Sequence, residues 1–142
     1  MNMLPKPLVK PVIIDPLAFT LALIGSPLLV AVFGFWILLI PVVGLVMGGP
    51  LYLAIGVPVL LWMIPRFGVH AFPVALTAAA SNLVFTSIGL VAFYLLRGSR
   101  VDLDDAAMLY LAFGTPLAFV WGFVFALLYP KFERAPYRAL NA

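Results

Sequence analysis

Charged and apolar positions divide the chain into three long uncharged runs. Asp, Glu, Lys and Arg are absent from residues 16–65, 67–96 and 106–130. A helix needs about 20 apolar residues to cross the roughly 30 Å of hydrocarbon in a bilayer. The first run has room for two such helices and each of the other runs has room for one, so the pattern predicts four.

The spans are predicted to be helices because lipid offers no hydrogen-bond partners to the backbone. The runs also lack the regular alternation of apolar and polar residues that a lipid-facing barrel strand shows. We therefore predict an all-α, polytopic integral membrane protein with four transmembrane helices. These helices should cover about residues 16–38, 41–64, 70–96 and 105–129.

The break between the first two helices has two candidate positions. A turn near residues 36–41 gives two spans of even length and places Trp36 at the membrane interface. A turn within residues 44–50 gives a long first helix and a short second one, since two glycines permit positive φ and the following proline suits a helix start. We prefer the even division, and both positions give the same number of spans.

Composition supports lipid as the solvent of this chain. Of its 142 residues, 65% are hydrophobic and 9% are charged, whereas soluble domains carry about 25% charged residues. The absence of cysteine excludes disulfides, thiolate metal sites and thiol nucleophiles. The formal charge of +3 is small and dispersed, so nucleic acid is not an expected partner.

Lysine and arginine lie unevenly about the four predicted spans. Arg97 and Arg100 fall on one side, and six cations fall on the other: Lys6, Lys10, Arg66, Lys131, Arg134 and Arg138. The positive-inside rule then predicts that both termini are cytoplasmic, in a proline-rich tail of residues 1–15 and a basic tail of residues 131–142. We expect the protein in a bacterial inner (plasma) membrane, with Arg66, Lys131, Arg134 and Arg138 anchored at anionic lipid headgroups.

Small residues gather on one face of the third predicted span. At 100° per residue, the stripe consists of Ala75, Ala78, Ala79, Asn82, Thr86 and Gly89. Small residues let helices approach closely, and a polar side chain such as Asn82 then bonds across them. We therefore interpret the stripe as a helix-packing face, and a lining for a substrate path is the alternative.

The remaining polar residues favour structural roles. Asp102, Asp104 and Asp105 precede the fourth predicted helix, where carboxylates cap free N–H groups, and they lack the length and glycine of an EF-hand loop. His70, the single histidine, is separated from them by a whole span of roughly 40 Å. The sequence therefore predicts no catalytic residue, no metal site and no cofactor.

These features predict a non-catalytic membrane protein. Ion-driven transporters generally place ionisable residues within the membrane, and the predicted span cores hold none. The leading hypothesis is an accessory, assembly or structural subunit that packs against a membrane-protein partner or a second copy of itself. The alternatives are a homo-oligomeric passive channel or facilitator lined by Asn82 and Thr86, and a membrane enzyme that uses the aspartates or His70 at a headgroup.

Overall fold

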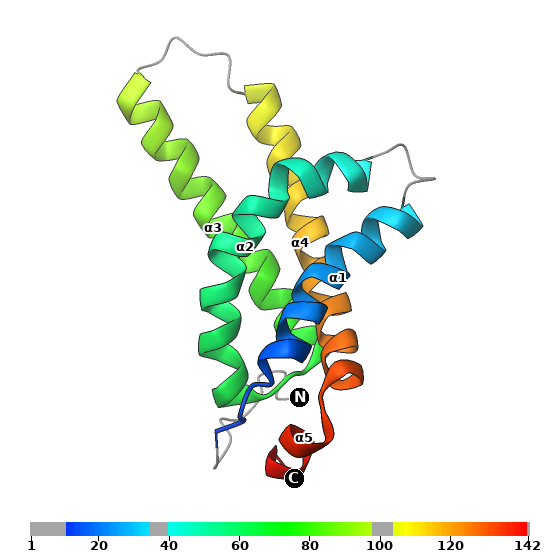
Figure 1. The fold of residues 1–142 in the computed structure, drawn as a ribbon. Helices are drawn as coiled ribbons and strands as arrows, with labels where there is room; N and C mark the ends of the chain where they lie inside the picture. Colours follow the sequence, from blue (N-terminus) through cyan, green and yellow to red (C-terminus); the bar gives the residue numbers. More distant parts are fainter. Residues whose placement is uncertain (1–10, 35–39, 98–103, 142) are drawn as a thin grey trace, which may run out of the picture.

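Helices make up all the regular structure in the described part of the chain. The computed structural model describes residues 11–34, 40–97 and 104–141. Its helices, shown in Figure 1, are α1 (Pro16–Gly34), α2 (Ile40–Phe67), α3 (Ala71–Arg97), α4 (Asp104–Phe132) and α5 (Ala135–Asn141). The predicted all-α class is therefore confirmed for these residues.

Three helical stretches in the described residues are long and apolar enough to cross a membrane. They are Pro16–Gly34, Ala71–Leu96 and Leu111–Phe132. A fourth apolar stretch, Tyr52–Phe67, is shorter, and it is the last part of α2. By length and composition, therefore, α1, α3 and α4 are the helices of the described residues that could cross a membrane.

The first two helices are separated between Gly34 and Ile40. The preferred break near residues 36–41 overlaps this gap, whose residues 35–39 lie outside the described residues, as does the first part of the predicted tail, residues 1–10. The alternative break at residues 44–50 lies inside α2, which continues through it. Glycine permits a turn without requiring one, and in lipid an unbroken helix keeps backbone hydrogen bonds satisfied.

The link between α2 and α3 follows from local chemistry. Gly68 directly follows α2 with a positive φ of 74°, and its N–H donates to the carbonyl of Ile64 at 2.9 Å. A glycine in this conformation is the common way to end a helix. Pro73 lies in the first turn of α3, where the missing N–H breaks no intrahelical bond.

The basic tail, residues 131–142, contains helical structure that the sequence did not predict. α4 continues through Pro130 to Phe132, and residues 135–141 form α5, a helix that was not predicted from the sequence. Pro136 is the second residue of α5. Proline is tolerated in a first turn because its N–H would lack an intrahelical partner there.

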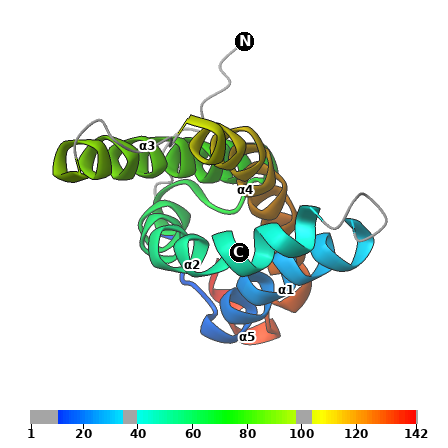
Figure 2. The same cartoon turned by 90° about the horizontal axis from the view of Figure 1, so that it is seen from above.

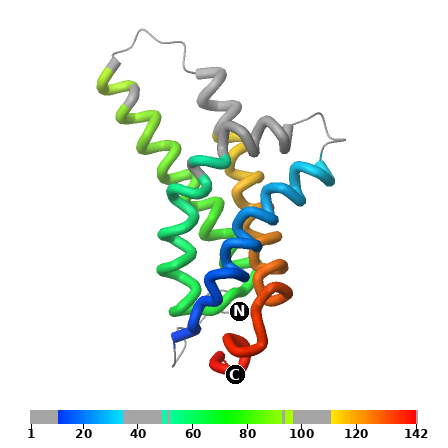
Figure 3. The backbone as a smooth tube through the Cα atoms, viewed as in Figure 1, coloured from blue at the N-terminus to red at the C-terminus, as the bar shows by residue number. Residues whose placement is uncertain are grey.

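α4 is the central helix of the bundle. It packs against α1, α2 and α3, and within the described residues α1 and α3 do not contact each other. Figure 2 shows α4 lying between them. α1 and α3 start at one end of the bundle, and α2 and α4 finish there. We call this the converging end, because the helices spread apart from it toward the opposite end (Figures 1 and 3).

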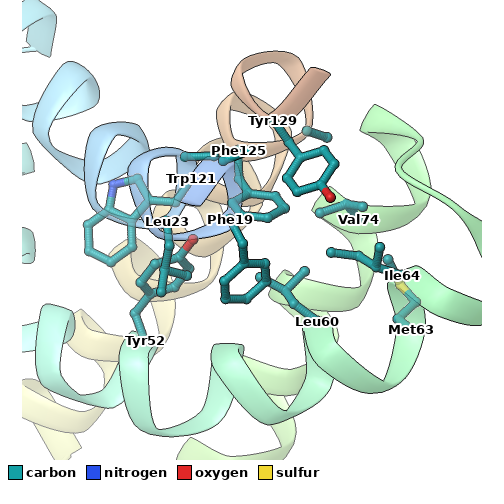
Figure 4. Close-up of a cluster of buried hydrophobic side chains, with 13 residues drawn as sticks. Phe19, Leu23, Tyr52, Leu60, Met63, Ile64, Val74, Trp121, Phe125 and Tyr129 are labelled. Atoms are coloured by element: carbon teal, nitrogen blue, oxygen red, sulfur yellow. The ribbon is translucent and has the colours of Figure 1, made fainter. Parts of the chain in front are cut away.

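Aromatic side chains form the core of the converging half. Trp121, Phe125 and Tyr129 are spaced four residues apart, so they share one face of α4. Phe19 of α1 meets Phe125 edge to face at a centroid distance of 5.5 Å, and Tyr52 of α2 meets Trp121 in the same way at 5.1 Å. Figure 4 shows these rings together with the aliphatic residues of α2 and α3. This face of α4 therefore holds α1 and α2 in place.

The contact between α3 and α4 depends on small residues. A Cβ added to Gly122 of α4 would lie 2.9 Å from the Cβ of Ala78, and 3.1 Å from both the Cα of Ala75 and the carbonyl oxygen of Val74. Atoms that close would clash, so the two backbones approach to a distance that only glycine allows. This is the packing that small residues permit between membrane helices.

Replacing Gly122 with alanine should separate α3 from α4. We expect Gly122→Ala to lower the free energy of unfolding by about 1–3 kcal/mol, the usual cost of overpacking. Denaturant titration in detergent, followed by tryptophan fluorescence, measures the change. Gly89→Ala on α3 is the matched control, because a Cβ there meets nothing within 4 Å. Equal losses from the two substitutions would contradict a close helix contact at Gly122.

Candidate functional site

Asp15 lies directly before α1 and caps its free N–H groups. Its Oδ1 accepts hydrogen bonds from the N–H of Leu17 at 3.0 Å and of Ala18 at 3.4 Å. Its carbonyl oxygen accepts from the N–H of Phe19 at 2.9 Å, the first bond of the helix. Aspartate is a preferred residue at this position, and proline is favoured at the next one, which Pro16 occupies. Asp15 is therefore the N-cap of α1.

Arg134 binds the same carboxylate from the segment after α4. Its Nε donates to Oδ2 of Asp15 at 2.9 Å and its Nη2 donates to Oδ1 at 2.8 Å. The backbone N–H of Arg134 adds a bond to Oδ2 at 3.0 Å. The hydroxyl oxygen of Tyr129 accepts a hydrogen bond from the backbone N–H of Asp15 at 3.0 Å. Bidentate arginine–carboxylate pairs are among the strongest polar contacts in proteins, and this one joins residues 119 positions apart.

The environment of Asp15 fixes its charge. The carboxylate is fully covered by protein atoms, although it lies at the edge of the bundle. The guanidinium of Arg134 holds the pKa of Asp15 well below its ordinary value, aided by backbone N–H groups and opposed by burial. The same contact raises the pKa of Arg134. A carboxylate held so firmly in its ionised form is a poor proton donor or acceptor at neutral pH.

Asn141 ties the C-terminal helix to the segment before α1. Its Oδ1 accepts from the N–H of Ile13 at 2.9 Å, and its Nδ2 donates to the carbonyl of Ile13 at 3.0 Å and to Oε1 of Glu133 at 2.9 Å. The amide thus pairs with the backbone in both directions. We call the set of Ile13, Asp15, Tyr129, Glu133, Arg134 and Asn141 the terminal clasp.

The four residues predicted to anchor at headgroups all lie at the converging end. Arg66 and Lys131 are exposed, and Arg66 stacks on Trp62. Arg138 is exposed and donates to the carbonyl oxygen of Pro130 at 2.8 Å. Arg134 differs from the others because its guanidinium binds Asp15, a contact that was not predicted.

The small-residue stripe of α3 is turned toward α4 in the converging half. Ala75 is fully buried and Ala78 is partly buried against Gly122. Oδ1 of Asn82 accepts from the hydroxyl of Thr115 on α4 at 3.4 Å. This half of the stripe is therefore a contact within the chain.

The stripe is less covered as α3 runs away from the converging end. Ala79 is partly buried, and Gly89 is exposed. The Oγ1 of Thr86 is buried but has no hydrogen-bond partner among the described residues. Of the six predicted residues, Ala75, Ala78 and Asn82 thus meet α4, Ala79 and Thr86 are partly buried, and a Cβ on Gly89 would meet nothing within 4 Å among the described residues.

A second polar contact lies inside the bundle. Ser26 of α1 and Tyr52 of α2 are buried, and their hydroxyl oxygens are 3.5 Å apart. The indole of Trp121 meets Tyr52 edge to face, and its Nε1 is buried without a hydrogen-bond partner in the described part of the chain. These three residues sit in uncharged runs where no sequence motif marks them, so only the fold brings them together.

The remaining candidates do not assemble into a site. His70 is exposed, and its carbonyl oxygen accepts from the N–H of Val74 at 3.0 Å at the start of α3. Asp102 lies outside the described residues, and Asp104 and Asp105 begin α4. Within the described ranges, no group of three or more His, Cys, Asp or Glu residues could hold a metal ion.

Asp15 is the residue that sequence reasoning missed although a signal was present. Aspartate followed by proline ahead of an apolar run is the ordinary mark of a helix start. Its partner Arg134 carries no such signal, because nothing in the local sequence relates positions so far apart.

Comparison with known proteins gives no further information. No family model matches the sequence, and neither a curated protein nor a solved structure matches it. Only the residues and their geometry therefore bear on what the chain does.

Asp15→Asn should destabilise the fold and remove part of its acid sensitivity. Because the pKa of Asp15 is depressed in the folded state, its stabilisation is present above the ordinary aspartate pKa of about 4 and is lost as pH falls below that value. Thermal unfolding of the purified protein between pH 7 and pH 3 measures both effects. Asp15→Ala should be worse, since asparagine keeps the helix cap and alanine does not. An Asp15→Asn protein with the wild-type melting temperature and acid profile would contradict this role.

Proposed function

We propose that the chain is a four-span integral membrane protein of the bacterial inner membrane, with both termini in the cytoplasm. Its role is that of a non-catalytic accessory or structural subunit that packs against a membrane-protein partner through α3. The span count, the orientation and the exposure of α3 each have separate support.

Contacts at the converging end support four crossings. The N–H of Val12 donates to the carbonyl of Pro65 at 3.1 Å, so the start of α1 and the end of α2 lie at the same end of the bundle. The ion pair of Asp15 with Arg134 brings the end of α4 there as well. If α1 crosses the bilayer, α2 must cross back. α2 has 28 residues and so a contour length of about 42 Å, measured along the bend that Figure 1 shows, against roughly 30 Å of hydrocarbon.

The distribution of cations supports cytoplasmic termini. Arg66, Lys131, Arg134 and Arg138 lie at the converging end, and Arg97 ends α3 at the opposite end. Loops and tails rich in lysine and arginine remain on the cytoplasmic side of inner-membrane proteins. The converging end is therefore assigned to the cytoplasm.

The exposed outer face of α3 is the observation that carries the accessory role. In the most apolar 18 residues of each helix, 11% of the residues of α3 are buried, against 39% in α1 and 28% in α4. Its face away from α4 presents large apolar side chains, including Leu83, Val84 and Val91. Its mid-span amide, Asn82, bonds to Thr115 of the same chain. α3 contacts both α4 and α2 of its own chain, and its remaining exposed face is available to another membrane helix.

The channel alternative has less support. A path lined by Asn82 and Thr86 needs the small-residue face of α3 to be open. The close approach of Gly122 to Ala75 and Ala78 occupies the converging half of that face. This favours a packing role for the stripe.

Site-specific photocrosslinking tests the accessory role. A photoreactive residue at Val84 of α3 should give an adduct of discrete size with a membrane protein in intact cells. The control position is Leu21 of α1, which is similarly exposed, at 46% against 52% for Val84, and should give no such adduct. A protein that is strictly monomeric, and that forms adducts only with lipid at Val84, would contradict the proposal.

Single cysteines test the topology, because the natural chain contains none. Ala139→Cys, on α5, should react with a membrane-impermeant maleimide only after the membrane is permeabilised. Ser99→Cys, between α3 and α4, should react in intact spheroplasts. Labelling of both positions from the same side would refute the four-span arrangement.

A further inference from the structure

Charges at the converging end are sorted between the interior and the surface. The carboxylate of Asp15 is fully buried and that of Glu133 is only 13% exposed. Asp15 accepts from Arg134, and Glu133 accepts from Asn141 and also lies 4.0 Å from Nε of Arg138, with which it forms an ion pair. The side chain of Arg138 is 63% exposed, and Arg66 and Lys131 are exposed too. The acids are therefore turned inward, and the described surface at this end presents cations.

Arg66 is held in a fixed position on Trp62. Its guanidinium carbon lies 4.5 Å from the centre of the indole ring, and its Nη1 donates to the carbonyl oxygen of Trp62 at 3.1 Å. Trp62 itself is 57% exposed on the outer side of α2. Since one N–H group is used by the helix, the rest of the planar donor fork remains available to an acceptor outside the protein. Such a fork matches the oxygens of a phosphate group.

Exposed aromatic side chains mark the depth of this surface. Phe72 lies in the first turn of α3 and Phe132 is the last residue of α4, and both are exposed. Trp62 lies just over one turn before the end of α2. Trp is the typical residue of a membrane–water interface. Aromatic rings and outward cations therefore occur at the same helix ends, as expected where apolar helices meet headgroups.

We infer that the converging end is a docking surface for anionic phospholipid headgroups of the membrane leaflet that surrounds this end. Arg66, positioned by Trp62, binds a lipid phosphate, and Lys131 and Arg138 add attraction to the negatively charged layer. Arg134 takes no part, because its guanidinium is bound to Asp15. The inference rests on the proposed function in one respect, namely that this end lies at a membrane surface.

Lipid retention by the full-length protein tests the inference. The protein is purified in uncharged detergent and mixed with phosphatidylglycerol or phosphatidylcholine. Native mass spectrometry counts the bound lipids, and the melting temperature is read in parallel. The wild type should retain phosphatidylglycerol in preference, and Arg66→Gln should weaken that preference about fivefold, the equivalent of one surface cation. Trp62→Leu should weaken it as well, because the guanidinium loses its support.

Matched variants separate this surface from charge in general. Replacing Arg66, Lys131 and Arg138 together with glutamine should abolish the preference, whereas Arg97→Gln, at the opposite end, should leave it intact. Equal losses from the triple variant and from Arg97→Gln would overturn the inference, as would a wild type without preference. Stabilisation by inorganic phosphate equal to that by phosphatidylglycerol would also overturn it, since it would indicate a free-anion site.

Failure of the proposed function gives a different result. If the chain is not an integral membrane protein, alkaline carbonate releases the wild type from membranes. If only the lipid surface is wrong, the wild type resists carbonate but shows no phosphatidylglycerol preference.

Discussion

The ion pair between Asp15 and Arg134 is the contact on which the arrangement of the chain ends depends. A carboxylate taken out of water is costly unless its oxygens are paired and hydrogen-bonded. Here both oxygens are satisfied, by the first turn of α1 on one side and by Arg134 on the other. The carboxylate that caps α1 is therefore fully paired only when Arg134, which follows α4, binds it. Asn141 adds a second tie between the same two segments.

The aromatic face of α4 extends this closure into the bundle. Phe125 and Trp121 hold α1 and α2 through edge-to-face contacts, and Gly122, beside them, lets α3 approach. Beyond this region the helices diverge (Figure 1). α3 consequently packs against α4 and α2 and leaves its outer face exposed. Asn82 faces α4, where it bonds to Thr115, and the opposite face of α3 carries exposed apolar side chains.

The inward and outward roles of polar groups are linked. Asp15 is paired with Arg134, and Glu133 accepts from Asn141 and forms an ion pair with Arg138 at 4.0 Å. Arg134 stabilises the fold through Asp15, Arg138 is partly held by Pro130 and Glu133, and Lys131 is exposed at the surface. One short segment, at the end of α4 and directly after it, thus supplies both the terminal clasp and exposed cations.

The sequence by itself determined the helical class, the uncharged runs and the side on which cations accumulate, because hydrophobic length and charge are local properties. Its 3.6-residue periodicity also places Asn82 among small residues on one face of α3, which predicts a packing role for that face. Only the tertiary structure decided which helix that face meets, that Arg134 binds Asp15, and that Ser26 lies beside Tyr52. The α5 helix was missed as well. Such pairings join residues from different helices, and they are set by how the helices pack rather than by any spacing along the chain.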